Sequence, residues 1–318
     1  MVHLSKPGPD TGQFHTTEVR SSNKPSKSTS RIVALPSSAN GPHYQTPPNL
    51  AAGFNSLHLS HEHPARANLT ADGITTTQFK ITVETWGPSI LYSGGATWIE
   101  HKRNARDCLF GQFDTSDLAS STPSASNSQS NGTAQTNGTS KAKDSSSCPQ
   151  ENSKHIRFPR AFASPPQVVC WLNRLDLTSS PEHNYRLRSY ATHTTKSGFT
   201  AHIDTWSDTQ LNGAAMCWIA FPKEKALVDS GDISTLDIRS WSDPREETSG
   251  EVRFGKKFRA PPTVLVALNM LDAAGNADLR VAVKAQDVTG EGFKWTFSSG
   301  GDSTLYAAGG SWIALGFV

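Results

Sequence analysis

The sequence lacks the features that would place the protein in a membrane or an oxidising compartment. It has no run of 18 apolar residues, and its first residues, MVHLSKPGPD, have no apolar segment of the kind found in secretion signals. We therefore expect no membrane insertion and a cytoplasmic location, with a cell-surface or extracellular location through unconventional export as the alternative. The four cysteines show no CxxC spacing, which fits a reducing compartment.

Signatures of catalysis and of nucleic-acid binding are missing as well. There is no GxSxG, no P-loop, and no GxGxxG between a strand and a helix. The formal net charge is +2 with mixed signs and no basic stripe, which argues against a nucleic-acid partner. His61 and His63 lack the HExxH spacing, so an exposed histidine pair is favoured over a metal site. We predict a protein that is not an enzyme and binds no metal or cofactor.

What the sequence does contain is one pattern that occurs three times. An arginine is followed after 13 residues by an aromatic residue, after seven more by a tryptophan, and after twelve more by a second tryptophan. The three sets are Arg66, Phe79, Trp86, Trp98; Arg186, Phe199, Trp206, Trp218; and Arg280, Phe293, Gly300, Trp312. Only the third set departs, with a glycine at the first tryptophan.

The repeat extends upstream and sets the domain organisation. Each copy also has a diproline and, before it, a short segment with glycine, threonine and an acid at fixed positions. The repeats predict an N-terminal tail at 1–11 and units at 12–106, 111–224 and 231–318. Residues 120–152 of the second unit are rich in Ser, Thr, Asn, Gln and Gly, and are expected to be a disordered insert.

Apolar residues alternate with a period of two throughout the units. The segments 279–285 and 293–297 place their large apolar residues on one face, and no stretch shows an apolar face at helical spacing. The pattern predicts an all-β protein made of three tandem six-stranded antiparallel β-sandwich units.

The same alternation separates two kinds of tryptophan. Trp98, Trp218 and Trp312 lie in apolar strands and are predicted to be core residues. Trp86 and Trp206 lie on the polar face, either as platforms for a ligand or as packing between units.

The repeated arginines Arg66, Arg186 and Arg280 also point away from the core. Each taken alone is a solvated surface charge, but a guanidinium is also a planar set of donors that can hold two neighbouring sugar hydroxyls or a carboxylate. Arginine and tryptophan together are suited to bind a sugar.

The assembled motif resembles the H-type lectin family of the snail agglutinin. The best matches are FASPPQVVCWLNRLD (162–176) and FRAPPTVLVALNMLD (258–272), whereas unit 1 lacks the aspartate. The resemblance implies three sandwich units around a three-fold axis, here an intrachain pseudo-trimer, with sites for galactose or N-acetylgalactosamine at the junctions between units. It also implies that the carbohydrate-binding residues are Arg66, Arg186 and Arg280, the stacking Trp86 and Trp206, the nearby Tyr92 and Tyr306, and the acid Asp243.

The sequence departs from the family pattern at some of these positions. The family histidine after the tryptophan is Gly87, Ser207 or Gly301, and the acid is Lys24 in unit 1 and lost near 121–123 in unit 2. We expect a complete site to combine Asp243 and Arg280 with a tryptophan of a neighbouring unit.

These observations predict a lectin for galactose- or N-acetylgalactosamine-type glycans, acting in cell adhesion or defence. The alternative is a structural or adhesion module whose sugar sites have degenerated and which binds protein partners. In either case we expect the units to associate with one another, while homo-oligomerisation is left open.

Overall fold

The computed structural model describes residues 10–38, 41–103, 105–119 and 150–316. This part of the chain is mainly β-strand, which confirms the predicted fold class. Its helical structure is limited to η1 (Thr16–Glu18), α1 (Ser116–Ala119) and η2 (Thr235–Asp237). No helix in these residues is long and apolar enough to cross a membrane.

Each unit contributes six main strands in the same order. Unit 1 contains β1 (Asp10–His15), β2 (Ser28–Ala34), β5 (Asn49–Leu59), β6 (Ala65–Asp72), β7 (Gln78–Glu84) and β8 (Leu91–His101). Unit 2 contains β9 (Leu109–Asp114), β10 (Glu151–Arg157), β11 (Gln167–Leu177), β12 (Tyr185–Thr192), β13 (Gly198–Asp204) and β14 (Leu211–Phe221). Unit 3 contains β15 (Val228–Ser234), β16 (Glu247–Arg253), β17 (Thr263–Ala273), β18 (Leu279–Gln286), β19 (Gly292–Ser298) and β20 (Leu305–Leu315). Unit 1 also has a small hairpin, β3 (Ser37–Ser38) and β4 (Gly41–Pro42).

Two strands begin inside segments that were predicted to be the N-terminal tail and the disordered insert. β1 begins at Asp10, within the expected N-terminal tail, because its first residues pair with β8. β10 begins at Glu151, within the expected insert 120–152, because its next residue, Asn152, is buried and pairs with β13. The remainder of that insert, residues 120–149, lies outside the described residues.

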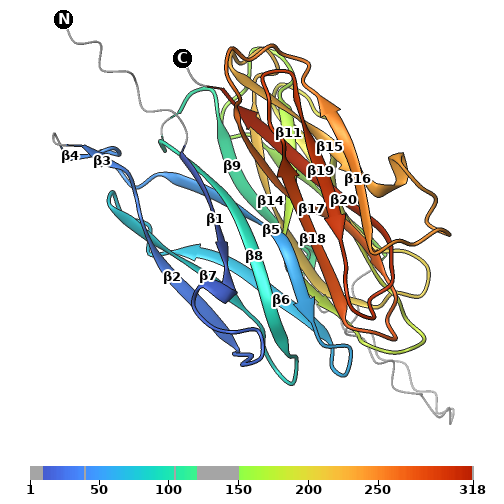
Figure 1. Cartoon of the computed structure of the whole chain (residues 1–318). Coiled ribbons are helices and arrows are strands. Elements are labelled where there is room, and N and C mark those ends of the chain that lie inside the picture. Colours follow the sequence, from blue (N-terminus) through green and yellow to red (C-terminus); the bar gives the residue numbers. More distant parts are fainter. Residues whose placement is uncertain (1–9, 39–40, 104, 120–149, 317–318) are drawn as a thin grey trace, which may run out of the picture.

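The six strands of a unit form two three-stranded halves, and each half continues into a half from another unit (Figure 1). The three antiparallel sheets have the strand orders β1-β8-β5-β18-β19-β16, β2-β7-β6-β11-β14-β9 and β10-β13-β12-β17-β20-β15. Every sheet therefore belongs to two units. The units are joined by backbone hydrogen bonds as well as by side-chain packing.

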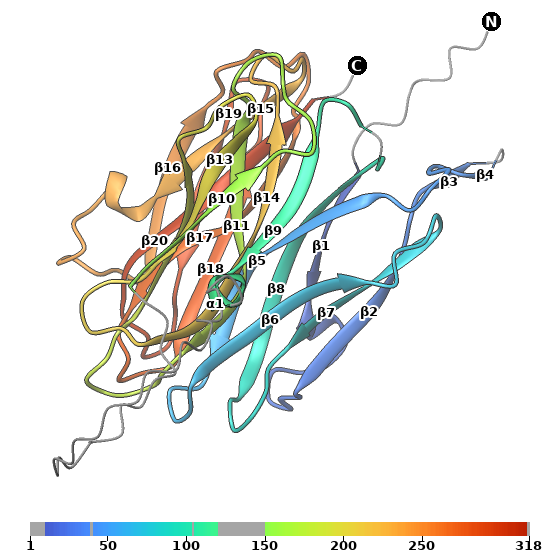
Figure 2. The same cartoon turned by 180° about the vertical axis from the view of Figure 1, so that it is seen from behind.

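Three strand pairs connect the units in a closed ring (Figures 1 and 2). Junction 1/2 is the pairing of β6 with β11, junction 2/3 that of β12 with β17, and junction 3/1 that of β18 with β5. The same two strands of the repeat meet at all three junctions, and the third junction returns to unit 1. The chain is therefore the intrachain pseudo-trimer that the resemblance implies.

The inside of each sandwich repeats one aromatic contact. The rings of Phe79 and Trp98, Phe199 and Trp218, and Phe293 and Trp312 meet edge to face, with centroids 5.5, 5.3 and 5.4 Å apart. All six side chains are buried. The second tryptophan of each repeat is thus a core residue, as predicted, and edge-to-face contacts add to the stabilisation from burial.

A second apolar cluster lies where the three units meet, and there the side chains at one repeated position differ greatly in size. The corresponding positions hold Gly53, Trp171 and Ala267, and Trp171 is fully buried. A Cβ atom on Gly53 would lie 2.4 Å from Cβ of Trp171 and 2.9 Å from Cβ of Ala267. One tryptophan fits only because the other two units leave room for it, so three identical units could not pack in this way.

Candidate functional site

At every junction the repeated arginine lies opposite a polar side chain of the next unit. Nε of Arg66 is 3.0 Å from Oδ1 of Asp176, and Nε of Arg186 is 3.2 Å from Oδ1 of Asp272. At junction 3/1 Nε of Arg280 donates to Nε2 of His58 at 2.9 Å. The arginines are thus held between units, where the resemblance places the sugar sites. Their surroundings differ from one junction to the next.

At junction 1/2 the exposed-face tryptophan is accompanied by two guanidinium groups. Cζ of Arg66 lies 5.9 Å and Cζ of Arg174 lies 5.8 Å from the ring centroid of Trp86. Such cation–π contacts are favourable and hold the ring. Arg174 also pairs with Asp114, and Asp176 accepts a hydrogen bond from Asn212 at 3.2 Å. The loop of unit 2 that corresponds to the Asp243 loop falls in residues 120–149, outside the described residues.

At junction 2/3 the arginine and the tryptophan line a cavity of about 580 Å³. Its walls come from both units and include Arg186, Trp206 and Ser207 of unit 2 and Leu236, Trp241, Met270 and Asp272 of unit 3. Trp206 is half-buried, whereas Trp241 is 62% exposed. Arg186 forms ion pairs with Asp208 and Asp272, which fix its guanidinium in the wall. The cavity therefore presents hydrogen-bond donors beside two indole rings.

Tyr306 and Asp243 lie next to this cavity on unit 3. The ring of Tyr306 contacts Trp241 edge to face, with centroids 6.5 Å apart. Asp243 follows Trp241 by two residues, pairs with Arg245 at 2.7 Å, and is not among the residues that line the cavity. Its loop nevertheless supplies Leu236 and Trp241 to the cavity of Arg186.

The sequence had led us to expect Asp243 and Arg280 in one site, but the structure separates the loop of Asp243 from Arg280. Arg280 lies on β18, which pairs with β5 of unit 1, whereas the loop of Asp243 faces β12 of unit 2. The two residues belong to one unit but to different junctions. Strand pairing between units is the physical reason.

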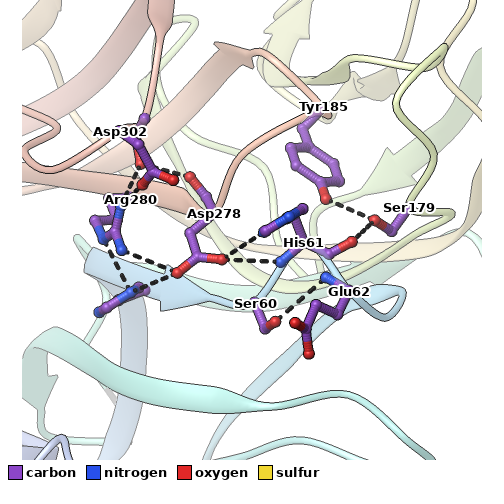
Figure 3. Close-up of polar contacts among 10 residues, drawn as sticks. Ser60, His61, Glu62, Ser179, Tyr185, Asp278, Arg280 and Asp302 are labelled. Atoms are coloured by element: carbon purple, nitrogen blue, oxygen red, sulfur yellow. Dashed lines mark hydrogen bonds and ion pairs between the residues drawn. The ribbon is translucent and has the colours of Figure 1, made fainter.

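At junction 3/1 the arginine is surrounded by polar partners (Figure 3). Arg280 donates to Asp278 Oδ2 at 2.9 Å and to Ser303 Oγ at 3.3 Å, and it also pairs with Asp302. His58 completes the set, and the ring of Tyr92 lies 4.5 Å from that of His58. Gly300 leaves this junction without a tryptophan at the position of Trp206.

Asp278 connects Arg280 to the loop of unit 1. It accepts hydrogen bonds from the backbone N–H of His61 at 3.1 Å and interacts with the ring nitrogens of His61 and His58 at 2.8 and 3.2 Å. Burial alone would raise the pKa of Asp278, but the hydrogen bonds from His61 and the charge of Arg280 hold that pKa below its usual value. Burial also lowers the pKa of His58. In the described residues no group of three or more potential metal ligands occurs, and His61 serves this polar cluster.

The residue after the first tryptophan position of the repeat, which Gly300 occupies in unit 3, has a left-handed backbone in all three units. The φ angles are +59° for Gly87, +60° for Ser207 and +62° for Gly301. A Cβ on Gly87 would lie 2.7 Å from Nη1 of Arg66, and one on Gly301 would lie 2.5 Å from Nη1 of Arg280. Glycine suits this position because it accepts positive φ and lets the arginine approach. Ser207, the one residue with a side chain there, lines the cavity of junction 2/3.

Several residues around the cavity were not singled out from the sequence. Trp241 has a detectable signal, since a large aromatic residue stands among polar residues in RSWSDP. Asp176 and Asp272 belong to a repeated motif, but nothing in the sequence shows that they face the arginine of another unit. Asp278 has no counterpart, because the other units carry Pro64 and Asn184 at that position.

Comparison with known proteins identifies a family for this chain. A model of the H-type lectin domain matches the chain three times, over residues 41–99, 153–221 and 249–315, which together make up more than half of it. The three matches fall in the three units.

The individual proteins that resemble this chain match only part of it or have low sequence identity. A Fuscovulum blasticum protein described as ATP synthase subunits region ORF 7 is 31% identical over 68 residues, and the match spans 21% of this chain and 59% of that protein. Two structures of discoidin II from Dictyostelium discoideum are 16% and 17% identical over 56% and 49% of this chain, covering 87% and 73% of theirs, each with a TM-score of 0.26. At that score the likeness carries no weight for fold or function.

Proposed function

We propose, from the premise that this chain belongs to the H-type lectin domain family, that junction 2/3 is its principal sugar site. Membership in the family makes the protein a carbohydrate-binding lectin. The proposal concerns which junction binds and which sugar it prefers, namely terminal galactose or N-acetylgalactosamine.

The chemistry of the cavity suits a pyranose. Arg186 uses Nε and Nη1 for Asp272 and Asp208, and its remaining N–H groups can donate to sugar hydroxyls. Trp206 offers a ring for the apolar C–H face of the sugar, and Trp241 lines the same cavity. We place Tyr306 and Asp243 at the rim, where a phenol and a carboxylate can reach the outer hydroxyls.

The observation that carries the proposal is that Arg186 and Trp206 line one cavity together with a second tryptophan. The other junctions are less suited to a sugar. At junction 1/2 two guanidinium groups already lie within 6 Å of the Trp86 ring. At junction 3/1 no ring takes the place of Trp206, and Arg280 already has several polar partners.

Isothermal titration with galactose, N-acetylgalactosamine and glucose tests the proposal. Trp206→Ala removes the stacking ring from a half-buried position and should weaken galactose binding about tenfold or more. Trp86→Ala is the matched control at junction 1/2 and should leave the affinity nearly unchanged. The proposal fails if the intact protein binds neither galactose nor N-acetylgalactosamine, or if the two variants lose affinity equally.

Ser207 bears on the choice between the two sugars. It takes the place of the family histidine, which the resemblance associates with preference for N-acetylgalactosamine. We therefore propose that galactose and N-acetylgalactosamine bind with similar affinity. Ser207→His should then shift the ratio toward N-acetylgalactosamine, and a ratio unchanged by this substitution would contradict the interpretation.

A second candidate function is favoured by the polar closure of junction 3/1. A junction whose arginine is fully engaged resembles a degenerate sugar site, and apolar side chains such as Val19 and Ile32 are more than half exposed. An adhesion module that binds protein partners would share these features. Competition by free galactose separates the two, because a protein partner held by such surfaces would not be released.

A further inference from the structure

A second cavity, of about 690 Å³, continues from the cavity of junction 2/3. Arg188, Tyr190, Leu236 and Met270 line both cavities, so the two share a wall. Beyond these residues the second cavity reaches Thr194 and Lys223. The two cavities together form one groove along the junction, which we call the extended groove.

One strand provides much of its length. Arg186, Arg188 and Tyr190 are alternate residues of β12 and therefore lie on one face. At a rise of about 3.3 Å per residue, Arg186 and Tyr190 are roughly 13 Å apart along the strand. A single sugar ring at Trp206 would leave the wall at Tyr190 uncovered.

Arg188 is a guanidinium held in place without an acid partner. Its Cζ lies 4.9 Å from the ring centroid of Tyr190, and that ring stacks on His202 with centroids 4.5 Å apart and planes 4° apart. Among the residues that the structure describes, Arg188 has no hydrogen bond or ion pair, although it lines both cavities. Its N–H donors are therefore available to a ligand, while cation–π contact and stacking fix its position.

A hydrogen bond also holds the hydroxyl end of Tyr190. Its hydroxyl donates to Oδ2 of Asp204 at 2.6 Å. Burial, together with this hydrogen bond, raises the pKa of Tyr190 to about 12, so the phenol keeps its proton at neutral pH. The stack of His202, Tyr190 and Arg188 is thus a preorganised wall.

The charges of the extended groove are mixed. Arg188 and Lys223 stand against Asp232 and Asp237, and Glu151 lines the end at Trp206. Asp232 accepts hydrogen bonds from the neutral groups of Ser311 and Asn269. Sugar hydroxyls both donate and accept, which suits walls of both signs. An anionic ligand would be attracted by the cations but repelled by the carboxylates beside them, which offsets much of the gain.

We infer that the extended groove binds a neutral oligosaccharide, with its terminal sugar at Trp206 and its following sugars along Arg188 and Tyr190 toward Lys223. The inference rests on the proposed function, since it places the terminal sugar in the cavity of Arg186. It goes beyond that function by assigning the ligand class as a chain of at least two sugars.

Junction 1/2 contains a natural control. A cavity of about 730 Å³ lies at the corresponding place and is lined by Asn68, Thr70, Arg103 and Gln112, at the positions of Arg188, Tyr190, Lys223 and Asp232. Neither Arg66 nor Trp86 lines it. This cavity is as large as the second cavity of junction 2/3, but it lacks the stacked guanidinium.

The test compares galactose with neutral tri- and tetrasaccharides that end in galactose, titrated into the full chain. The intact protein should bind the oligosaccharides about tenfold more tightly than galactose. Arg188→Asn introduces the residue that unit 1 carries, so the fold should tolerate it. It should reduce that tenfold advantage to about twofold, with a smaller loss of affinity for galactose than for the oligosaccharides. Asn68→Ala, the matched control at junction 1/2, should change neither.

The outcomes separate this inference from the proposed function. Equal affinities for galactose and the oligosaccharides in the intact protein would overturn the inference and leave the galactose site standing. An equal loss for both ligands in Arg188→Asn would overturn it as well, and so would a sulfated oligosaccharide that binds more tightly than its neutral form. Oligosaccharide binding that survives Trp206→Ala but needs Arg188 would refute the terminal-sugar placement and hence both proposals.

Discussion

Junctions 2/3 and 3/1 are built from the same pair of strands, yet one contains a cavity and the other a closed polar cluster. At junction 2/3 Asp272 faces Arg186, and two tryptophans line the space beside them. At junction 3/1 His58 takes the place of that aspartate, and Asp278, just before the strand of Arg280, supplies the negative charge. The comparison shows that a repeated arginine has no fixed role. Its partners decide whether its donors remain available to a ligand.

The largest expected difference between the junctions is in stability. Arg280→Ala should lower the free energy of unfolding by about 3 kcal/mol, because it leaves the largely buried Asp278 without its cation. Denaturant unfolding measures this change, and galactose affinity should stay the same. Arg188→Ala, at an exposed arginine with no acid partner in the described residues, is the control and should cost less than about 0.5 kcal/mol. Loss of galactose binding in Arg280→Ala without loss of stability would reverse the roles assigned to the two junctions.

Acid should weaken junction 3/1 and spare junction 2/3. Burial lowers the pKa of His58 in the folded protein. The contribution of neutral His58 to the free energy of unfolding is therefore complete above pH 6.5, its pKa in the unfolded chain, and is lost as the pH falls below that value. The lowered pKa of Asp278 adds a further loss as pH falls through the range below 3.8. Burial raises the pKa of Asp272 despite Arg186, so acidification does not reduce the contribution of that group. Unfolding free energies between pH 7 and pH 4 should fall less in His58→Gln than in the intact protein.

His101 also affects stability in this pH range, so its effect has to be separated from that of His58. Burial, with Lys225 and Lys102 adding to it and Asp107 opposing it, lowers the pKa of His101 from 6.5 to about 4. Its neutral form is favoured in the folded state, so about 2 to 3 kcal/mol of stability should be lost between these values. His101→Phe, which introduces the residue that unit 2 carries, should remove this loss. If its pH profile equals that of the intact protein, His101 is not the group responsible.

The smallest expected effect tests whether the missing tryptophan alone explains junction 3/1. Gly300 has a φ of +84°, so Gly300→Trp should cost about 1 kcal/mol from backbone strain. It should not create a galactose site, because Arg280 remains bound to Asp278, Asp302 and His58. Gly300→Ala measures the strain by itself in unfolding experiments. A second galactose site in titrations of Gly300→Trp would show that the ring, and not the polar closure, distinguishes the junctions.

Much of the fold could be predicted because its signals are local. The period of two placed Phe199, Ala201 and Ile203 on the inner face, and all three are buried. Equal spacing identified three units, and the tryptophans of apolar strands were correctly separated from Trp86 and Trp206. These inferences depend only on residues that are neighbours along the chain.

The candidate site was less predictable because its parts come from distant segments. Arg66 and Asp176 are 110 residues apart, and Arg280 and His58 are 222 residues apart. Repetition marked the arginines, but it could not reveal that each one faces the next unit. Asp243 was therefore assigned to the arginine of its own unit, whereas its loop lies at Arg186.

By itself the sequence determined that this protein consists of three β-sandwich repeats with aromatic cores, because alternation and spacing are properties of the chain alone. Only the tertiary structure decided that the two halves of each sandwich pair with different neighbouring units, and that Trp171 fills the centre between Gly53 and Ala267. It also decided which arginine lies in a cavity and which is closed off by Asp278. The physical reason is that hydrogen bonds and packing between strands join residues whose separation in sequence carries no signal of their contact.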